Sequence, residues 1–396
     1  MPDAPRLTAC QLASKFKPSG LMVPMPVITT RLRELFILSA SSQPRRLRAV
    51  ETLPRRNYKY PSAYNNTSLR RSAACKKELI VISGATGFIG RALVTRLVQS
   101  GAPVRCLLRP QVRTPQLPRS FAVPVANADL ESGNGLAAAC AGARVVIHLA
   151  GNYARGTAAS LMAADYRGTL QLLQAAQQAG VQRFVYLSHL GADRASAFQL
   201  LKIKGLAEEF IRQSGVPFTI VQSAPVFGTG DALPSMLAAL LRLAPGVFVR
   251  PGPSDARWQP LWVQDLVHGL VAVCAERGFE NRTIEIGGPE ALTLNEVLAA
   301  IMAAIGVHRQ IITAPLAYSR PAMRVWRSLW PQSPLAGCWL DLLAVNQACE
   351  INSMQRFFEL RPARFSPNLG YLRGHSWLDD WRRLTGRRMA ETQKNL

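Results

Sequence analysis

The stretch from Leu79 to Val94 reads L-I-V-I-S-G-A-T-G-F-I-G-R-A-L-V and combines a strand, a glycine turn and the start of a helix. Its apolar beginning suits a strand that is buried on both faces. Gly84 serves a tight turn, Gly87 lets backbone N–H groups approach a pyrophosphate, and Gly90 lets the helix pack against the strand. The positive end of the helix then faces the anion, so the stretch predicts a dinucleotide site.

The residues after the turn complete the unit that such a site requires. A helix is expected from Arg91 to Gln99 and a second strand from Val104 to Leu108. A glycine triplet alone is a weak signal, because most glycine-rich turns are only turns, but a strand, turn, helix and strand in this order indicate dinucleotide binding. The expected cofactor contacts in the turn are Gly84, Thr86, Gly87, Phe88, Ile89 and Gly90.

Strands and helices continue to alternate further along the chain. More strands are expected over residues 121–125, 144–151, 184–188 and 218–222, with helices over 161–179 and 196–214. This alternation predicts an α/β fold, a doubly wound parallel-sheet Rossmann domain over residues 78–230. A helix over 233–243, a strand over 283–286 and a helix over 294–305 predict a smaller C-terminal α+β lobe for substrate or partner over residues 231–375, followed by a tail over 376–396.

The formal net charge of +23 is concentrated at the start of the chain. Residues 1–77 hold 15 Lys/Arg against 3 Asp/Glu, with eight prolines and no sustained periodicity, so we expect a basic, disordered leader. Its composition is typical of a transit peptide, which would direct the chain to the matrix side of the mitochondrial inner membrane or to a plastid. The alternative is a flexible tail or an overlong start on a cytoplasmic or membrane-peripheral protein.

Other bulk features narrow the class of protein. Seven cysteines without a Cys-x-x-Cys pair favour reduced thiols, and the sequence indicates no metal site. The longest apolar stretch, over residues 233–249, is interrupted by Arg242 and Pro245, which argues against a membrane span. Residues 311–350 place tryptophans between arginines and prolines, which suits an anionic membrane face or a protein partner as well as a lobe core. Charge alone would fit nucleic acid, but no aromatic platform accompanies it, so nucleic acid is disfavoured.

The end of the second strand bears on the choice of cofactor. An acidic residue about 20 positions after the glycine turn binds a bare ribose, whereas an arginine accommodates a 2′-phosphate. Arg109 ends this strand, Arg113 follows, and no Asp or Glu lies between Leu93 and Asp129. We therefore favour NADP(H) over NAD(H). Asp129, with Leu130 beside it, is expected near the adenine, although an aspartate at a strand end is more often a cap.

Three later segments are expected at the carboxyl edge of the sheet, where such folds bind ligands. The cofactor contacts expected there are Leu149, Ala150, Gly151 and Pro225, and the small residues among them would let the nicotinamide side lie against the backbone. Ser188 and His189 end the fifth strand, where either side chain would reach a substrate carbonyl. His148 is interpreted as a packed strand histidine.

Together these motifs resemble the atypical short-chain dehydrogenase/reductase superfamily, and within it the 39 kDa (NDUFA9-type) accessory subunits of respiratory complex I and their bacterial relatives. The resemblance spans roughly residues 78–373. It rests on six ordered segments, residues 84–90, 184–190, 204–209, 226–231, 259–265 and 286–290. It implies a nicotinamide dinucleotide as cofactor and subunits of a membrane respiratory complex as partners.

The sequence departs from the superfamily at the catalytic pair. Its oxidoreductases use Tyr-x-x-x-Lys, in which the lysine lowers the pKa of the tyrosine and binds the nicotinamide ribose. By its spacing to Glu208, Lys204 matches the lysine, but Leu200 stands four positions earlier. Counting from Lys202 gives Phe198 instead. Neither side chain has a proton to donate, so the resemblance implies nucleotide binding without efficient hydride transfer.

Two hypotheses for function follow. The first is an NAD(P)H-binding, non-catalytic or weakly catalytic accessory or assembly factor of a membrane electron-transfer complex similar to complex I. The alternative is an NADPH-dependent reductase or epimerase that acts on a small carbonyl or quinone. In that case Ser188, His189 or an ordered water replaces the tyrosine, and Lys204 assists.

Overall fold

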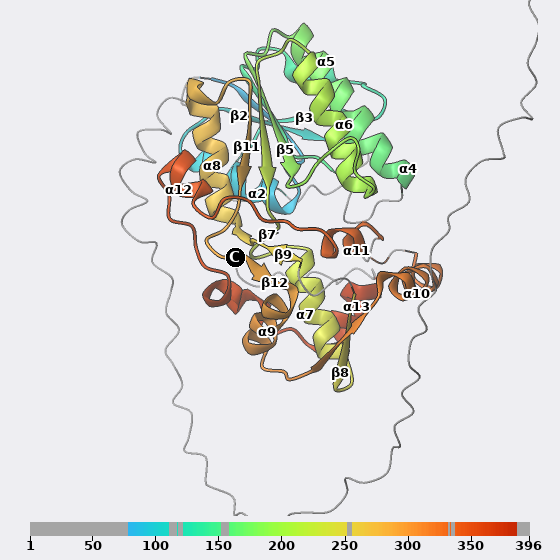
Figure 1. Ribbon diagram of the computed structural model, residues 1–396. Coiled ribbons are helices and arrows are strands. Elements are labelled where there is room, and N and C mark those ends of the chain that lie inside the picture. Colours follow the sequence, from blue (N-terminus) through green and yellow to red (C-terminus); the bar gives the residue numbers. More distant parts are fainter. Residues whose placement is uncertain are drawn as a thin grey trace, which may run out of the picture. The chain divides into compact units, whose positions relative to one another are not determined.

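The computed structural model (Figure 1) describes residues 78–110, 117, 122–151, 158–251, 256–331, 333 and 337–385. The leader expected over residues 1–77 lies outside the described residues, as does Arg113. Within the described ranges, no helix has both the length and the apolar character that crossing a membrane requires.

Seven parallel strands form the main sheet, in the order β3, β2, β1, β4, β5, β6, β11. They are β1 (Ile80–Ser83), β2 (Val104–Leu108), β3 (Val125–Asn127), β4 (Val145–His148), β5 (Arg183–His189), β6 (Phe218–Ser223) and β11 (Arg282–Ile286). The chain winds outward from β1 in one direction and from β4 in the other, which confirms the predicted doubly wound Rossmann sheet. A ligand is expected at the carboxyl ends of β1 and β4, where the winding reverses.

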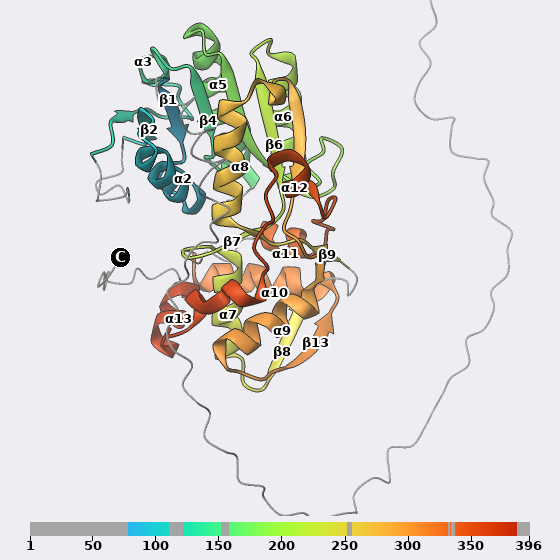
Figure 2. The ribbon, with the colours of Figure 1, turned by 90° about the vertical axis from the view of Figure 1, so that its left-hand side faces the viewer.

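Helices cover both faces of this sheet, as Figures 1 and 2 show. One face carries α2 (Phe88–Gln99), α8 (Val263–Ala275) and α12 (Ser353–Phe358), and the other carries α3 (Leu136–Cys140), α5 (Gly168–Gln178) and α6 (Gln199–Gln213). The alternation of side chains along β1 explains this arrangement. Ile80 and Ile82 pack with Leu93 of α2 on the first face, whereas Val81 packs with Leu172 of α5 on the second.

The single helix predicted over residues 161–179 is divided into three parts. It consists of α4 (Ala158–Leu161), a π-helical turn (Met162–Arg167) and α5. Short π-helical turns are frequent at functional sites, because they redirect one side chain out of the regular helical pattern. Here the turn carries Asp165, which is fully buried and reaches the candidate site.

The second lobe packs around its own apolar core. Its helices are α7 (Leu233–Leu243), α9 (Leu294–Ile305), α10 (Leu316–Leu329), α11 (Gly337–Leu343) and α13 (Trp377–Thr385), and a 3₁₀ turn at Ser366–Leu372 packs in the same core. Another 3₁₀ turn, at Arg277–Phe279, follows α8 beside the main sheet. Its strand pairs are β7 (Val226–Phe227) with β10 (Leu261–Trp262), β9 (Arg257–Trp258) with β12 (Leu292–Thr293), and β8 (Val247–Pro251) with β13 (Gln310–Ala314). Phe227, Trp258 and Leu298 lie in this core.

Two segments occupy positions that differ from those predicted from the sequence. Strand β11, expected in the second lobe, instead pairs with β6 of the main sheet, and α8 before it packs beside α2 on the same face of that sheet. Residues 377–385, expected in a tail, form α13, which packs against α7. Arg242 and Asp380 join these two helices at 2.8 Å with the Asp380 side chain buried, so α13 is part of the lobe.

Candidate dinucleotide site

The glycine turn after β1 has no room for side chains at two of its positions. Gly84 has a φ of +76°, and a Cβ atom there would approach the Ala150 nitrogen to 2.7 Å. A Cβ atom on Gly90 would approach the Gly84 oxygen to 2.1 Å. These distances confirm the expected roles in the tight turn and in the packing of helix on strand.

The amino end of α2 is open toward the carboxyl edge of the sheet. Gly87 is its N-cap residue in an extended conformation, and the first turn has neither a side-chain cap nor an acidic residue. A Cβ atom on Gly87 would meet only the Gly84 oxygen, at 3.2 Å. A helix end with unpaired N–H donors and a positive dipole suits a phosphate, so the turn fits a pyrophosphate without rearrangement.

The other expected contacts in the turn differ in their surroundings. Thr86 is half-buried at the turn. Ile89 packs against the core of the sheet. The Phe88 ring faces Gly228, 3.5 Å from where a Cβ atom on that glycine would lie, so it connects the turn to the loop after β7. Contact of these three side chains with a nucleotide therefore stays a prediction, whereas their backbone lies in the turn.

On the adenosine side, Arg109 and Asp129 lie at the ends of neighbouring strands. The Asp129 carboxylate accepts hydrogen bonds from the Glu131 N–H at 3.1 Å and the Ser132 hydroxyl at 2.9 Å. These bonds, with a smaller contribution from the Arg109 charge, lower the pKa of Asp129. The carboxylate thus closes a turn, while Arg109 stays exposed. Leu130 is buried in the sheet core, so only its backbone is available to a ligand.

The end of β4 brings the nicotinamide side of the site together. The Leu149 N–H donates to the Ser83 oxygen at 3.1 Å, which holds the strand end beside the glycine turn. A Cβ atom on Gly151 would lie 2.7 Å from Asp165 Oδ1 and 3.8 Å from Lys204 Nζ. The backbone of Gly151 thus lies beside the Asp165–Lys204 pair. A lysine that binds the nicotinamide ribose is expected next to this end of β4.

Lys204 is buried, and its charge is paired. Its Nζ lies 3.2 Å from Asp165 Oδ1 and 4.9 Å from the centroid of the Tyr186 ring. Burial alone would lower the pKa of Lys204, but the interactions with Tyr186 and Asp165 outweigh it and raise this pKa. Burial also raises the pKa of Tyr186, so we infer a charged lysine beside a neutral phenol. Asp165 and Tyr186 could not be predicted as site residues from the sequence, because only the fold brings them to Lys204.

The positions of Leu200 and Phe198 agree with the expected loss of the proton donor. Leu200 is fully buried in an apolar cluster with Leu161 and Leu201, and Phe198 is the residue before α6. The side chain of Tyr186 interacts with Lys204, but Tyr186 lies on β5 and is fully buried. Its position differs from that of a tyrosine one helical turn before the lysine.

The two residues proposed as substitute proton donors have different environments. Ser188 is buried near Glu208, but no hydrogen-bond partner of its hydroxyl is seen among the described residues. Glu208 accepts hydrogen bonds from Gln222 at 2.9 Å and from Arg212 at 2.7 Å. Ser188 therefore lies beside a buried polar pair of contacts and away from solvent. His189 is half-buried, and desolvation together with the Lys204 charge lowers its pKa to about 3. It is neutral at physiological pH.

His148 is a packed strand residue, as interpreted. Its Nδ1 lies 2.5 Å from the Ser83 hydroxyl and its Nε2 lies 2.9 Å from the Thr169 hydroxyl. Because Thr169 donates to the Asp165 carbonyl, it accepts from Nε2–H, which leaves Nδ1 to accept from Ser83. Burial lowers the pKa of His148 to about 3, so the ring joins β1 to α5 in its neutral form.

The later motifs connect the second lobe to the sheet. Gln259 is fully buried, donates to the Gly288 oxygen at 2.7 Å and accepts from the Cys349 N–H at 2.7 Å. Asp231 accepts from the Gly228 N–H at 3.0 Å and from the Tyr371 hydroxyl. Pro225, expected to contact the cofactor, is half-buried, and its carbonyl accepts from the Leu261 N–H at 2.9 Å. Direct contact of Pro225 with a nucleotide stays a prediction.

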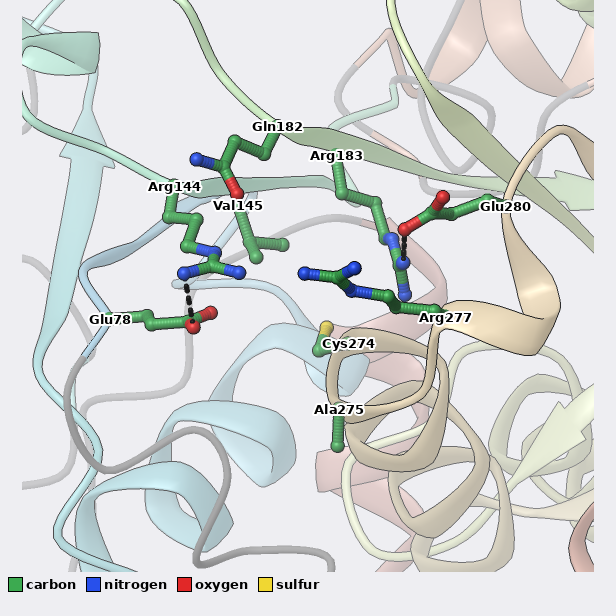
Figure 3. Close-up of a pocket in the computed structure, with 9 residues that line it drawn as sticks. All are labelled: Glu78, Arg144, Val145, Gln182, Arg183, Cys274, Ala275, Arg277 and Glu280. Carbon is green, nitrogen blue, oxygen red and sulfur yellow. Dashed lines mark hydrogen bonds and ion pairs between the residues drawn. The ribbon is translucent and has the colours of Figure 1, made fainter.

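A cavity of about 210 Å³ lies at the opposite edge of the sheet (Figure 3). It is lined by residues at the starts of β1, β4 and β5 and by the end of α8 with the turn that follows it, and three of the lining residues are arginines, Arg144, Arg183 and Arg277. Glu78 and Glu280 pair with the first two of these arginines. Ligands of doubly wound sheets bind at the carboxyl ends of the strands, so this cavity is not the dinucleotide site.

Comparisons with known proteins agree with this geometry. Residues 84–228 match the family described as NAD(P)H-binding. The chain is 30% identical over 228 residues to the mitochondrial NADH dehydrogenase [ubiquinone] 1 alpha subcomplex subunit 9 of Arabidopsis thaliana, covering 56% of each. It is 33% identical over 199 residues to a ceramide reductase of Caulobacter vibrioides, covering 50% of this chain and 61% of the relative. The chain thus spans less than two thirds of the length of both relatives.

A solved structure supports the fold alone. The epimerase Mth375 of Methanothermobacter thermautotrophicus superposes with a TM-score of 0.61 at 18% identity, over 78% of this chain and 94% of the epimerase. Its likeness extends well beyond the NAD(P)H-binding region, into the second lobe. The glycine cradle, the sheet order and the family match together identify residues 84–228 as an NAD(P)H-binding region with a Rossmann fold, and the complex I relative supports the likeness of the chain to NDUFA9-type members of the atypical short-chain dehydrogenase/reductase superfamily.

Proposed function

We propose that the chain holds NADP(H) as a structural ligand and serves as an accessory or assembly subunit of a membrane electron-transfer complex similar to complex I. The observation that carries this proposal is the combination of an intact phosphate cradle with Lys204 in a buried ion pair and Leu200 in the place of the tyrosine. A bound nicotinamide supplies a hydride, but reduction of a carbonyl also needs a proton donor at the developing alkoxide.

The residues around Lys204 support binding more than turnover. The Lys204 ammonium is kept charged by Asp165 and stands beside the Gly151 backbone, where it would donate to ribose hydroxyls. Tyr186 is held beside it as a neutral phenol, and Ser188 is buried on the same face of β5. The complex I relative supports the accessory role, and its mitochondrial location supports a transit peptide in residues 1–77. A plastid is the alternative destination.

The alternative function is a reductase, and the ceramide reductase relative is the observation that favours it. Under this alternative, Tyr186, His189 or an ordered water would deliver the proton. The two functions are separated by the fate of bound NADPH in the presence of carbonyl and quinone acceptors.

The choice of NADP(H) over NAD(H) rests on Arg109. Its exposed guanidinium lies at the end of β2, and the first acidic residue that follows it in the sequence, Asp129, is engaged in a turn. We expect Arg109→Ala to weaken NADPH binding by about tenfold or more, because a charge-assisted contact to a 2′-phosphate contributes about 1.5–3 kcal/mol. NADH binding should hardly change.

Titration of both nucleotides against both proteins checks this expectation. Arg105→Ala is a matched control, since Arg105 lies on the same strand but donates to the Ala139 and Ala141 carbonyls. Equal losses of NADPH and NADH affinity in Arg109→Ala would show that Arg109 does not read the 2′-phosphate.

A further inference from the structure

Helix α10 presents an apolar stripe to solvent. The stripe consists of Tyr318, Ala322, Val325 and Leu329, at the four- and three-residue spacings that align side chains on one side of a helix. The side chains of Tyr318, Val325 and Leu329 are 74%, 61% and 64% exposed. Another side of α10 carries Met323 and Trp326, which pack against the apolar cluster under α7 and α11. The helix is thus anchored by one face and leaves the stripe uncovered.

A row of positive charges lies on the side of α10 opposite this stripe. Arg320, Arg324 and Arg327 follow one another at four- and three-residue spacing, and the row borders the anchored face, because Arg320 and Arg327 lie three and four residues from Met323. Arg320 pairs with Asp341 at 3.0 Å, whereas no ion pair is seen for Arg324 or Arg327 in the part of the chain that the structure describes. The sequence has no Asp or Glu between residues 297 and 340. Few acidic groups therefore offset the positive potential of this surface.

Aromatic rings extend the surface at the carboxyl end of α10. Trp326 and Trp330 lie 4.3 Å apart between ring centroids, and both meet the Trp381 ring of α13 edge-on. Trp377 precedes Trp381 by one helical turn and is 62% exposed. Tryptophan is enriched at membrane–water interfaces, because one part of its ring system is apolar and its N–H remains hydrated.

We propose that α10 lies in the headgroup layer of an anionic lipid bilayer, with the stripe toward the acyl chains and its arginines toward lipid phosphates. Charge complementarity selects this occupant, since an apolar stripe on one side of a helix and a row of arginines on the other is the pattern of interfacial helices. This proposal takes from the proposed function only one element, that the protein works next to a membrane. The nucleotide site has no part in it, so each is tested separately.

Vesicle binding of the full chain tests the proposal. Sedimentation is measured with vesicles of phosphatidylcholine alone and of phosphatidylcholine mixed with phosphatidylglycerol, at raised salt so that the basic leader adsorbs weakly. Val325→Glu is compared with Val125→Glu, which makes the same change at another exposed valine, on the edge strand β3. We expect Val325→Glu to lower the partition onto mixed vesicles by about tenfold, and Val125→Glu to leave it unchanged.

Several outcomes would overturn the proposal. These are no binding of the unaltered chain to mixed vesicles, equal binding to both kinds of vesicle, or equal binding by the two variants. A chain that ignores vesicles but loses a co-purifying subunit with Val325→Glu would assign the surface to a protein instead. NADPH affinity, measured on the same samples, shows that the variants are folded, and its absence in every sample would count against the proposed function alone.

Discussion

Replacing Gly87 with aspartate should abolish nucleotide binding while changing the stability of the fold little. The N-cap position of α2 has an extended backbone, and aspartate is a preferred N-cap residue that stabilises a helix by about 1 kcal/mol, which offsets the tight 3.2 Å approach of a Cβ atom to the Gly84 oxygen. The same carboxylate would stand where the pyrophosphate approaches the helix. Juxtaposed like charges cost several kcal/mol, so we expect NADPH affinity to fall by at least about a hundredfold.

Gly87→Asn separates charge from size in this experiment. Asparagine has nearly the same volume and also caps helices, but it carries no charge. We expect it to weaken NADPH much less than Gly87→Asp, with a similar melting temperature. If NADPH binds the aspartate variant as well as it binds the unaltered chain, the turn between β1 and α2 does not hold the phosphates.

The second large effect is expected at the buried ion pair. Lys204→Met would remove the ammonium and leave the Asp165 charge buried without its counterion, which typically lowers the free energy of unfolding by about 3–5 kcal/mol. Lys204→Met combined with Asp165→Leu removes both charges, and well-packed apolar replacements of buried pairs are often neutral. We therefore expect the double variant to recover most of the lost stability in urea unfolding.

The double variant also separates the two roles of Lys204. Its stability should be restored, but its NADPH affinity should stay reduced, because the ribose would still lack the lysine. A single variant as stable as the double variant would mean that Lys204 and Asp165 are not coupled in the folded protein.

The parts of the site that are continuous in sequence could be predicted from it. The turn from Gly84 to Gly90 needs glycine for local reasons, a positive φ in one case and a close backbone contact in the other, so the pattern itself shows the geometry. The parallel order of the first six strands likewise follows from their alternation with helices. Strand β11 was misplaced because a five-residue strand has no local feature that selects the sheet it joins.

The parts that converge from distant segments could not be predicted. Asp165 reaches Lys204 through a π-helical turn inside what looked like one regular helix, and Tyr186 reaches it through the pleat of β5. Ser188 follows Tyr186 by two residues along β5, so both side chains lie on the same face of the sheet, which α6 covers with Glu208. A strand-end serine thus looked accessible in sequence although the pleat turns it inward.

The fate of bound NADPH tests the central claim, that this fold keeps the nucleotide without using it. The nicotinamide absorbance of NADPH bound to the full chain is followed in the presence of quinones, aldehydes and ketones, beside the same mixtures without protein. We expect about one NADPH per chain, since one glycine cradle is seen in the described residues, with no oxidation above the protein-free rate. Rapid oxidation that disappears with Tyr186→Phe, Ser188→Ala or His189→Ala would contradict the account and establish a reductase with a substitute proton donor.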